Sequence, residues 1–166
     1  MEWYFLSIRE RNRWILTIGG ERVLLYKRRY EGTVCPKYDK VRHTSQQHGQ
    51  DDICQGTGFI GPNPRLGENK TTGYFDFIEV VVSLVSTGPE FVEVSDFGRK
   101  RTYKPRCWTL WEPLITEGDF IVRRNNQRLW VQAPTISRFK HFALHQSFDV
   151  VEIERNHPIY SIPSGL

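Results

Sequence analysis

Residues 118–131, GDFIVRRNNQRLWV, predict a β-hairpin and thereby indicate the fold class. Two short runs of β-branched and aromatic residues, at 120–123 and 128–131, are separated by the polar run 124–127. Because asparagine tolerates the left-handed backbone conformations of tight turns, the two asparagines of this run mark the turn. The stretch indicates a chain built from short antiparallel strands.

The sequence around this hairpin has the same character from residue 74 onward. The segment 74–85, YFDFIEVVVSLV, is rich in aromatic and β-branched residues. Further extended runs are predicted at 90–94, 101–111, 136–142 and 146–154. Short strands separated by frequent turns predict a mainly β protein, with a small β-barrel or β-sandwich domain at 74–157. Residues 158–166 are expected to form an extended C-terminal tail.

Large aromatic residues supply the expected core of this domain. The five assigned to it are Trp108, Trp111, Phe120, Trp130 and Phe148. The pair Trp108 and Trp111 also suits a platform on which bases or sugars stack. A small domain needs bulky side chains inside, so the core assignment is preferred.

The first thirty residues are predicted to form an N-terminal extension, helical and then extended. Trp3, Leu6 and Ile18 suit one face of a helix, whereas the run 15–18 also suits a strand. Gly19-Gly20 breaks this first segment, and residues 21–30 read as extended. We therefore expect a helix followed by a strand.

Composition excludes several classes of protein. The chain has 166 residues, of which 39% are hydrophobic and 13% aromatic, enough apolar area for a folded domain rather than a disordered chain. No apolar run approaches the roughly 20 residues of a membrane-spanning helix, and the start of the chain does not read as a secretory signal. The odd number of cysteines, three, argues against a disulfide framework and favours synthesis in a reducing cytoplasm.

Positive charge is concentrated at the start of the chain. The formal net charge is +4, and residues 1–50 hold ten Lys and Arg against five Asp and Glu. Such a basic segment is compatible with nucleic acid. Arg13, Arg28 and Arg29 are the candidates for contact with DNA or an acidic partner, although a solvated surface accounts for them as well.

Residues 31–73 form a long irregular Gly- and Pro-rich loop with a degenerate zinc-knuckle pattern. Tetrahedral zinc sites commonly take two ligands from each of two C-x-x-C turns. Cys35 and Cys54 occupy the first and last of these four positions. Asp51, His48 and His43 are candidates to complete a mixed ligand set.

Two other readings of this loop stay open. A disulfide between Cys35 and Cys54 would staple the same turns, although a cytoplasmic origin disfavours it. Alternatively, the metal has been lost and the loop packs on Tyr38 and Phe59. Any zinc is expected to be structural, and no cofactor is required.

Motifs of catalysis are missing from the sequence. It has no P-loop, H-E-x-x-H or G-x-S-x-G pattern. His141 and His145 are four residues apart, but in an extended segment this spacing does not bring ligands together. We do not expect an enzyme, and a carbohydrate-active barrel rests on the aromatic residues alone.

Three stretches together resemble a known family. They read RRYEGTVCPKYD, then DDICQGTGFIG followed by GYF, and finally FDVVEIE with HPIYSIP near the end. Neck proteins of tailed bacteriophages, the head-closure or head–tail connector components, have an arginine- and aromatic-rich lead-in, C-P-x-C-x-D, C-x-x-C-x-G-T-G-F-x-G-G-Y and a β-rich remainder. The resemblance covers most of the chain. It departs where Tyr38 and Asp51 replace two cysteines and where residues 62–72 are inserted.

The resemblance implies a structural virion protein made in the host bacterial cytoplasm. It would form a homo-oligomeric ring of about six or twelve copies between portal and tail. Its neighbours would be other neck, portal-adaptor or tail proteins, DNA would pass non-specifically through the lumen, and no membrane would be involved. The alternatives are a baseplate or tail-terminator ring, or a zinc-ribbon-like nucleic-acid-binding module.

Overall fold

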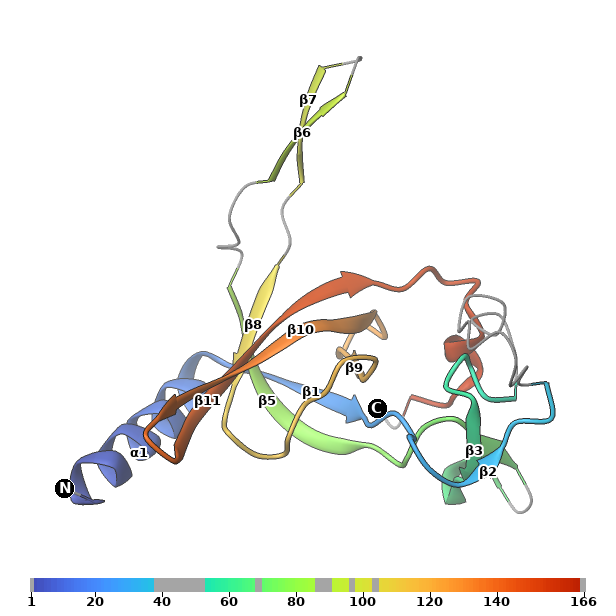
Figure 1. Cartoon of the computed structure of the whole chain (residues 1–166), viewed down its shortest axis with the longest axis horizontal. Coiled ribbons are helices and arrows are strands. Elements are labelled where there is room, and N and C mark those ends of the chain that lie inside the picture. The colour runs from blue at the N-terminus through green and yellow to red at the C-terminus, as the bar shows by residue number, and fades with distance from the viewer. Residues whose placement is uncertain are drawn as a thin grey trace.

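The computed structural model describes residues 2–37, 53–67, 70–85, 91–95, 98–102 and 105–164. Its centre is a closed six-stranded barrel with strand order β1-β5-β8-β11-β10-β9, in which every neighbouring pair is antiparallel. The strands are β1 (Glu21–Tyr26), β5 (Ile78–Val85), β8 (Arg106–Thr109), β9 (Phe120–Val122), β10 (Arg128–Phe139) and β11 (Phe142–Glu152). The prediction of a mainly β protein with a small barrel and an N-terminal helix is confirmed (Figure 1).

The hairpin predicted at 118–131 is present as β9 and β10. Arg128 pairs with Val122, and the turn between the strands is closed by a hydrogen bond from Arg123 N to Gln127 O of 2.9 Å. Asn126 has a φ of 60°, the left-handed conformation for which asparagine was expected.

The helix α1 (Glu2–Gly19) ends at the predicted glycine pair, and β1 follows directly. However, β1 is a barrel strand between β5 and β9 and not part of an extension, so the barrel begins well before residue 74. β1 belongs to the barrel because its side chains alternate between two apolar clusters, so that both faces of the strand are buried. Val23 and Leu25 face the interior cluster, whereas Leu24 and Tyr26 face a second cluster.

The runs predicted at 136–142 and 146–154 are one long hairpin, formed by β10 and β11. β10 continues through Pro134, which lacks a backbone donor for the ladder. A register shift between Gln132 and Thr135 and a φ of 44° at Ala133 absorb the proline as a bulge.

A further hairpin, β6 (Phe91–Ser95) and β7 (Gly98–Thr102), is inserted between β5 and β8. It stands clear of the barrel in Figure 1.

Two hydrophobic clusters stabilise the domain, one inside the barrel and one on the outer face of β1 and β9. Phe148 lies in the first and Phe120 in the second, as predicted. Trp130 packs against the second cluster and is partly buried. Trp108 and Trp111 belong to neither cluster of the described residues, so their assignment to the core was wrong. Trp108 alternates along β8 with the buried Cys107 and Thr109, which places it on the outside of the barrel.

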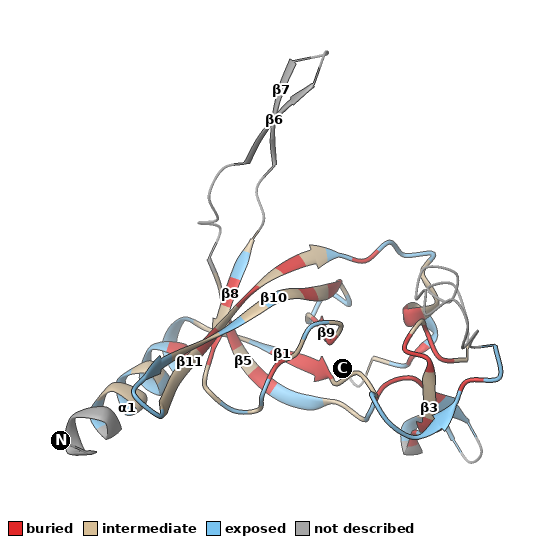
Figure 2. Cartoon of the chain, in the orientation of Figure 1, coloured by how far each residue is buried: buried red, intermediate tan, exposed pale blue. Residues whose placement is uncertain are grey.

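The expected extended tail is instead part of the packed domain. A 3₁₀-helix, η2 (Pro158–Ser161), follows β11, and Ile159 and Ile162 are buried in the second cluster. The guanidinium of Arg128, itself 2% exposed, donates to the carbonyls of Ile159 and Ile162. Ile159 and Ile162 are three residues apart, so in a 3₁₀-helix they lie on the same face and are buried together. An extended conformation would have placed them on opposite sides of the chain. Figure 2 shows buried segments in the barrel strands and also beyond them, at the end of the molecule opposite α1.

The irregular loop contains a small sheet. Its strands are β2 (Thr33–Val34), β3 (Phe59–Pro62) and β4 (Thr71–Thr72), with a 3₁₀-turn η1 (Pro64–Leu66) between the last two. We call residues 33–35, 53–67 and 70–74 the knuckle. Figure 1 shows the knuckle and α1 at opposite ends of the barrel.

Candidate functional site at the barrel–knuckle junction

The two predicted cysteine positions are brought to one turn. Cys35 follows β2 and Cys54 opens the turn 53–58, and both are buried. The backbone amide of Cys35 donates to Gly58 O at 2.9 Å, which ties the first strand to the end of that turn. The structure thus places the segment of Cys35 beside the turn that contains Cys54, and a metal at these cysteines stays a prediction.

Side-chain and backbone hydrogen bonds close this turn. Thr57 N donates to Cys54 O at 3.0 Å, and Thr57 Oγ1 lies 2.9 Å from the same oxygen. Gln55, with a φ of 49°, buries its side chain, whose Oε1 accepts from Thr72 Oγ1 at 2.8 Å and from Gly73 N at 3.0 Å. A Cβ at Gly73 would collide with Cys54 O and Thr57 Oγ1, so β4 approaches the turn more closely than any side chain permits.

The remaining predicted metal ligands, Asp51, His48 and His43, lie outside the described residues. Within residues 2–37, 53–67, 70–85 and the later described ranges, no group of three or more His, Cys, Asp and Glu is placed to hold a metal ion. The described knuckle thus offers two thiols, half of a tetrahedral zinc set.

Arg28 and Arg29 join the knuckle to the barrel. The Arg28 guanidinium points to the carbonyls of Gly56 and Thr57, at 3.5 and 3.4 Å from Nη2. Arg29 donates from Nε to Tyr74 O at 3.2 Å and from Nη2 to Pro62 O at 2.8 Å. These two guanidiniums therefore contact backbone oxygens of their own chain.

Arg29 is partly buried and stacks on an aromatic ring. Its guanidinium lies 4.0 Å from the centroid of the Phe75 ring, and burial lowers the pKa of Arg29 from its ordinary value. Because guanidinium titrates far above neutral pH, the charge is retained.

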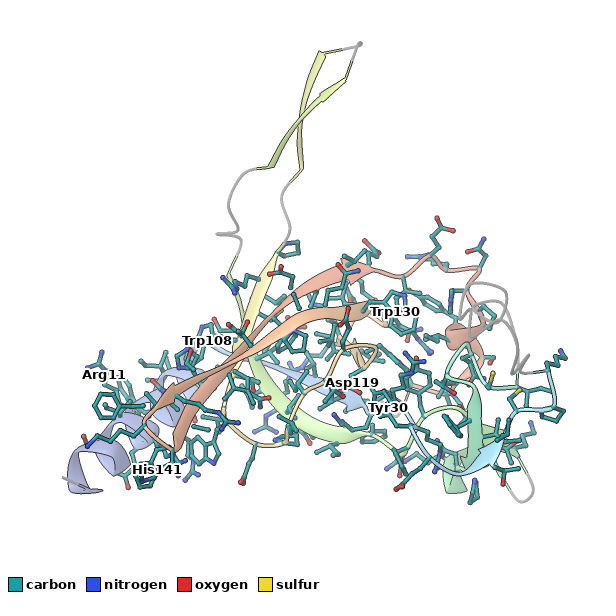
Figure 3. The ribbon with its side chains drawn as sticks, in the orientation of Figure 1. Arg11, Tyr30, Trp108, Asp119, Trp130 and His141 are labelled. Carbon is teal, nitrogen blue, oxygen red and sulfur yellow. The ribbon has the colours of Figure 1, made fainter. Side chains whose placement is uncertain are left out.

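Asp119 is the polar centre of the junction, and Figure 3 shows it beside Tyr30 at the end of the barrel. Its fully buried carboxylate accepts from Lys27 Nζ at 2.6 Å, Arg28 N at 2.8 Å and Thr116 N at 2.8 Å. A buried carboxylate is tolerated where charged and backbone donors satisfy its lone pairs. Asp119 thus fixes the end of β1 against the loop that precedes β9.

Tyr74 completes the junction from the knuckle side. Burial raises the pKa of the Tyr74 phenol, so at neutral pH it is an O–H donor, and it donates to Gly118 O at 3.3 Å. Its ring meets Phe120 edge to face, with centroids 4.8 Å apart. The knuckle is therefore held by both polar and aromatic contacts.

A cleft of about 310 Å³ opens beside these contacts. Its lining includes Arg28, Gln55, Trp130 and His157. His157 Nδ1 accepts from Ile159 N at 3.2 Å and so caps η2. Burial lowers the pKa of His157, which favours the neutral ring that this cap needs.

The third predicted arginine lies elsewhere. Arg13 is exposed on α1, with its guanidinium 5.9 Å from the centroid of the Trp111 ring. The structure does not bring it near Arg28 or Arg29, which lie beside the knuckle. Contact of these arginines with DNA or an acidic partner stays a prediction.

Sequence reasoning missed the residues that organise both ends of the molecule. Lys27 and Asp119 are 92 positions apart, and Gly118-Asp119 read only as the opening of a strand. Arg9 was read as one of several arginines, although it shares a helical stripe with Asn12 and Leu16. That i, i+3, i+7 spacing was the available signal.

The contacts of the junction fasten the knuckle to the barrel. The junction's charged and hydroxyl groups donate to or accept from the chain itself, as the contacts of Asp119, Arg28 and Thr57 illustrate. No helix in the described part of the chain is long and apolar enough to cross a membrane. Comparison with protein-family models and with curated proteins finds no match.

Proposed function

We propose that this chain is a non-enzymatic structural protein of a tailed-phage virion. It would form an oligomeric ring in the neck, which joins the head to the tail around the DNA channel. The proposal rests on the resemblance of the cysteine-containing stretches and the C-terminal segment to neck proteins, together with the architecture that carries them.

The observation that carries the proposal is the distribution of the chain around its barrel. α1 and the knuckle lie at opposite ends of the closed barrel, and the hairpin of β6 and β7 stands clear of it (Figure 1). A closed barrel has no free strand edges, so such a subunit associates through its appendages. Appendages at opposite ends give two different contact surfaces, which is what a cyclic ring uses.

The junction supports the same role mechanically. A ring subunit transmits force between its neighbours, which requires that its appendages be fixed to the body. The buried ion pair of Lys27 and Asp119 fixes the end of β1, and from there Arg28 and Arg29 reach the backbone oxygens of the knuckle. The engagement of Arg28 and Arg29 with backbone oxygens also leaves the free nucleic-acid-binding module with less support.

A conditional null mutation in the encoding phage tests the proposal. Under non-permissive conditions we expect heads that package DNA but do not join tails, and complementation with the chain in trans should restore infectivity. Normal yields of joined, infectious particles without the chain would overturn it. Tails that join but fail at the host surface would favour the baseplate alternative instead.

A further inference from the structure

Helix α1 has one stripe that docks on the barrel. Arg9 donates from Nε and Nη2 to Ala143 O, at 3.0 and 2.8 Å, and its guanidinium lies 4.3 Å from the centroid of the Trp111 ring. Asn12 and the buried Leu16 continue this stripe at helical spacing. The contacts fix the rotation of the helix about its axis.

A second stripe of the same helix faces solvent. Arg11, Trp14 and Ile18 follow the i, i+3, i+7 spacing, and Trp14 and Ile18 are 65% and 66% exposed. A surface helix normally presents polar residues on the face away from the core. We call Arg11, Arg13, Trp14 and Ile18 the helix patch.

A second apolar surface with the opposite charge lies at the junction. Tyr30 and Leu114 are each 54% exposed, and three exposed glutamates, at residues 31, 112 and 117, lie within three residues of them along the chain. A cation also lies there, since the Arg28 guanidinium is 5.5 Å from the centroid of the Tyr30 ring. We call Tyr30, Glu31, Glu112, Leu114 and Glu117 the loop patch.

The loop patch is held rigidly by the junction beneath it. Tyr30 Oη donates to Glu117 O at 2.5 Å. Lys27 Nζ donates to Leu114 O at 2.6 Å while it pairs with the buried Asp119. A preorganised surface loses less conformational entropy on binding.

We infer that the helix patch of one copy docks on the loop patch of the next copy, an inference that rests on the proposed ring. Two arginines on one surface meet three glutamates on the other, around apolar centres supplied by Trp14, Ile18, Tyr30 and Leu114. The exposed Glu10 lies one turn before Trp14, so the helix surface keeps a net positive charge of one. An apolar centre within a charged rim is the usual anatomy of a protein interface. Tryptophan and tyrosine are also the residues that most often dominate binding energy.

The geometry suits this head-to-tail contact and disfavours a two-fold contact of the helix patch with itself. Figure 3 places Arg11 and Tyr30 at separated positions, one on α1 and the other at the barrel–knuckle junction. Two distinct, separated surfaces generate rings or filaments when each copy binds the next. A two-fold contact of the helix patch with itself would instead bring Arg11 and Arg13 against their own copies, which is repulsive.

Cysteine cross-linking tests the contact directly. The full chain carrying both I18C and L114C is treated with a short bismaleimide, as the purified chain at high concentration and in particles that contain it. We expect a ladder of covalent oligomers on a denaturing gel. The single variants and the original chain, whose three cysteines are buried, should give no ladder.

Two outcomes overturn the inference. Dimers from I18C alone would show a two-fold helix contact, and no ladder from the double variant in either preparation would show that the patches do not meet. A ladder from the purified chain without any copy in particles would sink the proposed neck function and leave the contact standing. Particles that contain the chain in the neck but give no ladder would overturn the contact and leave the neck function standing.

Charge reversal provides an independent check. R11E with R13E, and separately E112K with E117K, should each weaken association at least about tenfold in sedimentation, a loss of about 1.4 kcal/mol. Combining all four changes should restore most of it. E152K with E154K is the matched control, with the same charge change on exposed residues outside the loop patch. Equal effects from this control would contradict the inference.

Discussion

Lys27 and Asp119 form an ion pair on the barrel side of the barrel–knuckle junction, with 2.6 Å between Nζ and Oδ2. The carboxylate is fully buried and the lysine side chain is 20% exposed. The pair connects the residue after β1 to the residue before β9, and thus fixes the two strands that close the barrel beside the knuckle.

Asp119→Asn is expected to lower the free energy of unfolding by about 3 kcal/mol. The substitution leaves the Lys27 charge partly buried without its counter-ion, which is the costly way to break such a pair. Urea unfolding followed by tryptophan fluorescence measures the change. Adding Lys27→Met to the variant should recover part of the loss, and a loss below about 0.5 kcal/mol in the single variant would contradict the role of the pair.

Gly73→Ala is expected to loosen the knuckle while leaving the barrel folded. The new Cβ collides with Cys54 O and Thr57 Oγ1, so the turn 53–58 must move. Alkylation of Cys35 and Cys54 should therefore accelerate by about tenfold or more.

The chain contains its own controls for this experiment. Cys107 lies in the barrel interior, where burial raises the pKa of its thiol to about 12, and it should stay protected. Gly19→Ala, where a Cβ meets nothing within 4 Å, should leave the alkylation rates of Cys35 and Cys54 as they are. Unchanged rates in Gly73→Ala would refute the tight approach of β4.

Stability is expected to fall as the pH drops below about 6.5, partly through His157. Burial lowers its pKa in the folded chain, so below the ordinary value the unfolded chain takes up the proton first. The contribution of the neutral ring is therefore present above about pH 6.5 and is lost as the pH falls through the folded-state pKa. Protonation also removes the Nδ1 acceptor for Ile159 N.

His157→Asn isolates this contribution, because asparagine caps a helix without titrating near neutral pH. Between about pH 7.5 and about pH 5, the variant should lose less stability than the original chain in urea unfolding. His145, whose pKa burial lowers as well, remains to give a residual slope in the variant. Identical pH profiles would exclude His157 as a contributor.

Arg128→Leu is expected to release the C-terminal segment and to cost about 3 kcal/mol, since two hydrogen bonds from a charged donor are lost. Carboxypeptidase should then digest past Ile162 and Ile159, which are buried in the original chain. Arg123→Leu is a matched comparison, because Arg123 pairs with Glu21 at 2.8 Å and touches no residue of η2 in the described contacts. Protection of the C-terminus in Arg128→Leu would contradict the fastening role.

Much of the barrel was predictable because its signals are local. The turn around Asn126 and the strands β5 and β9 can each be predicted from a few consecutive residues, a tight-turn asparagine and runs of β-branched residues. The membership of β1 was not predictable, because it depends on pairing Leu24 with Val122 far along the chain. The full length of β10 was not predictable either, because Pro134 normally interrupts a strand. Only the pairing with β11 shows that the strand continues through a bulge at Ala133.

The candidate site was predictable only in part. The two cysteine segments were identified by spacing, and they do meet at the turn 53–58. The roles of Lys27, Asp119 and Gln55 depend on which distant groups fold back onto them, and no local pattern carries that information. Arg28 and Arg29 were identified as notable residues, but their engagement with backbone carbonyls follows from the knuckle's position beside the barrel.

Counting the copies of this chain in purified particles tests the central proposal most directly. Quantitative mass spectrometry against portal subunits gives the number without assumptions about the position of the chain. A neck ring predicts about six or twelve copies per particle, the small number that a single closed ring on the head–tail axis holds. Hundreds of copies would move the chain to the capsid or tail tube, and complete absence from particles would contradict the proposed function.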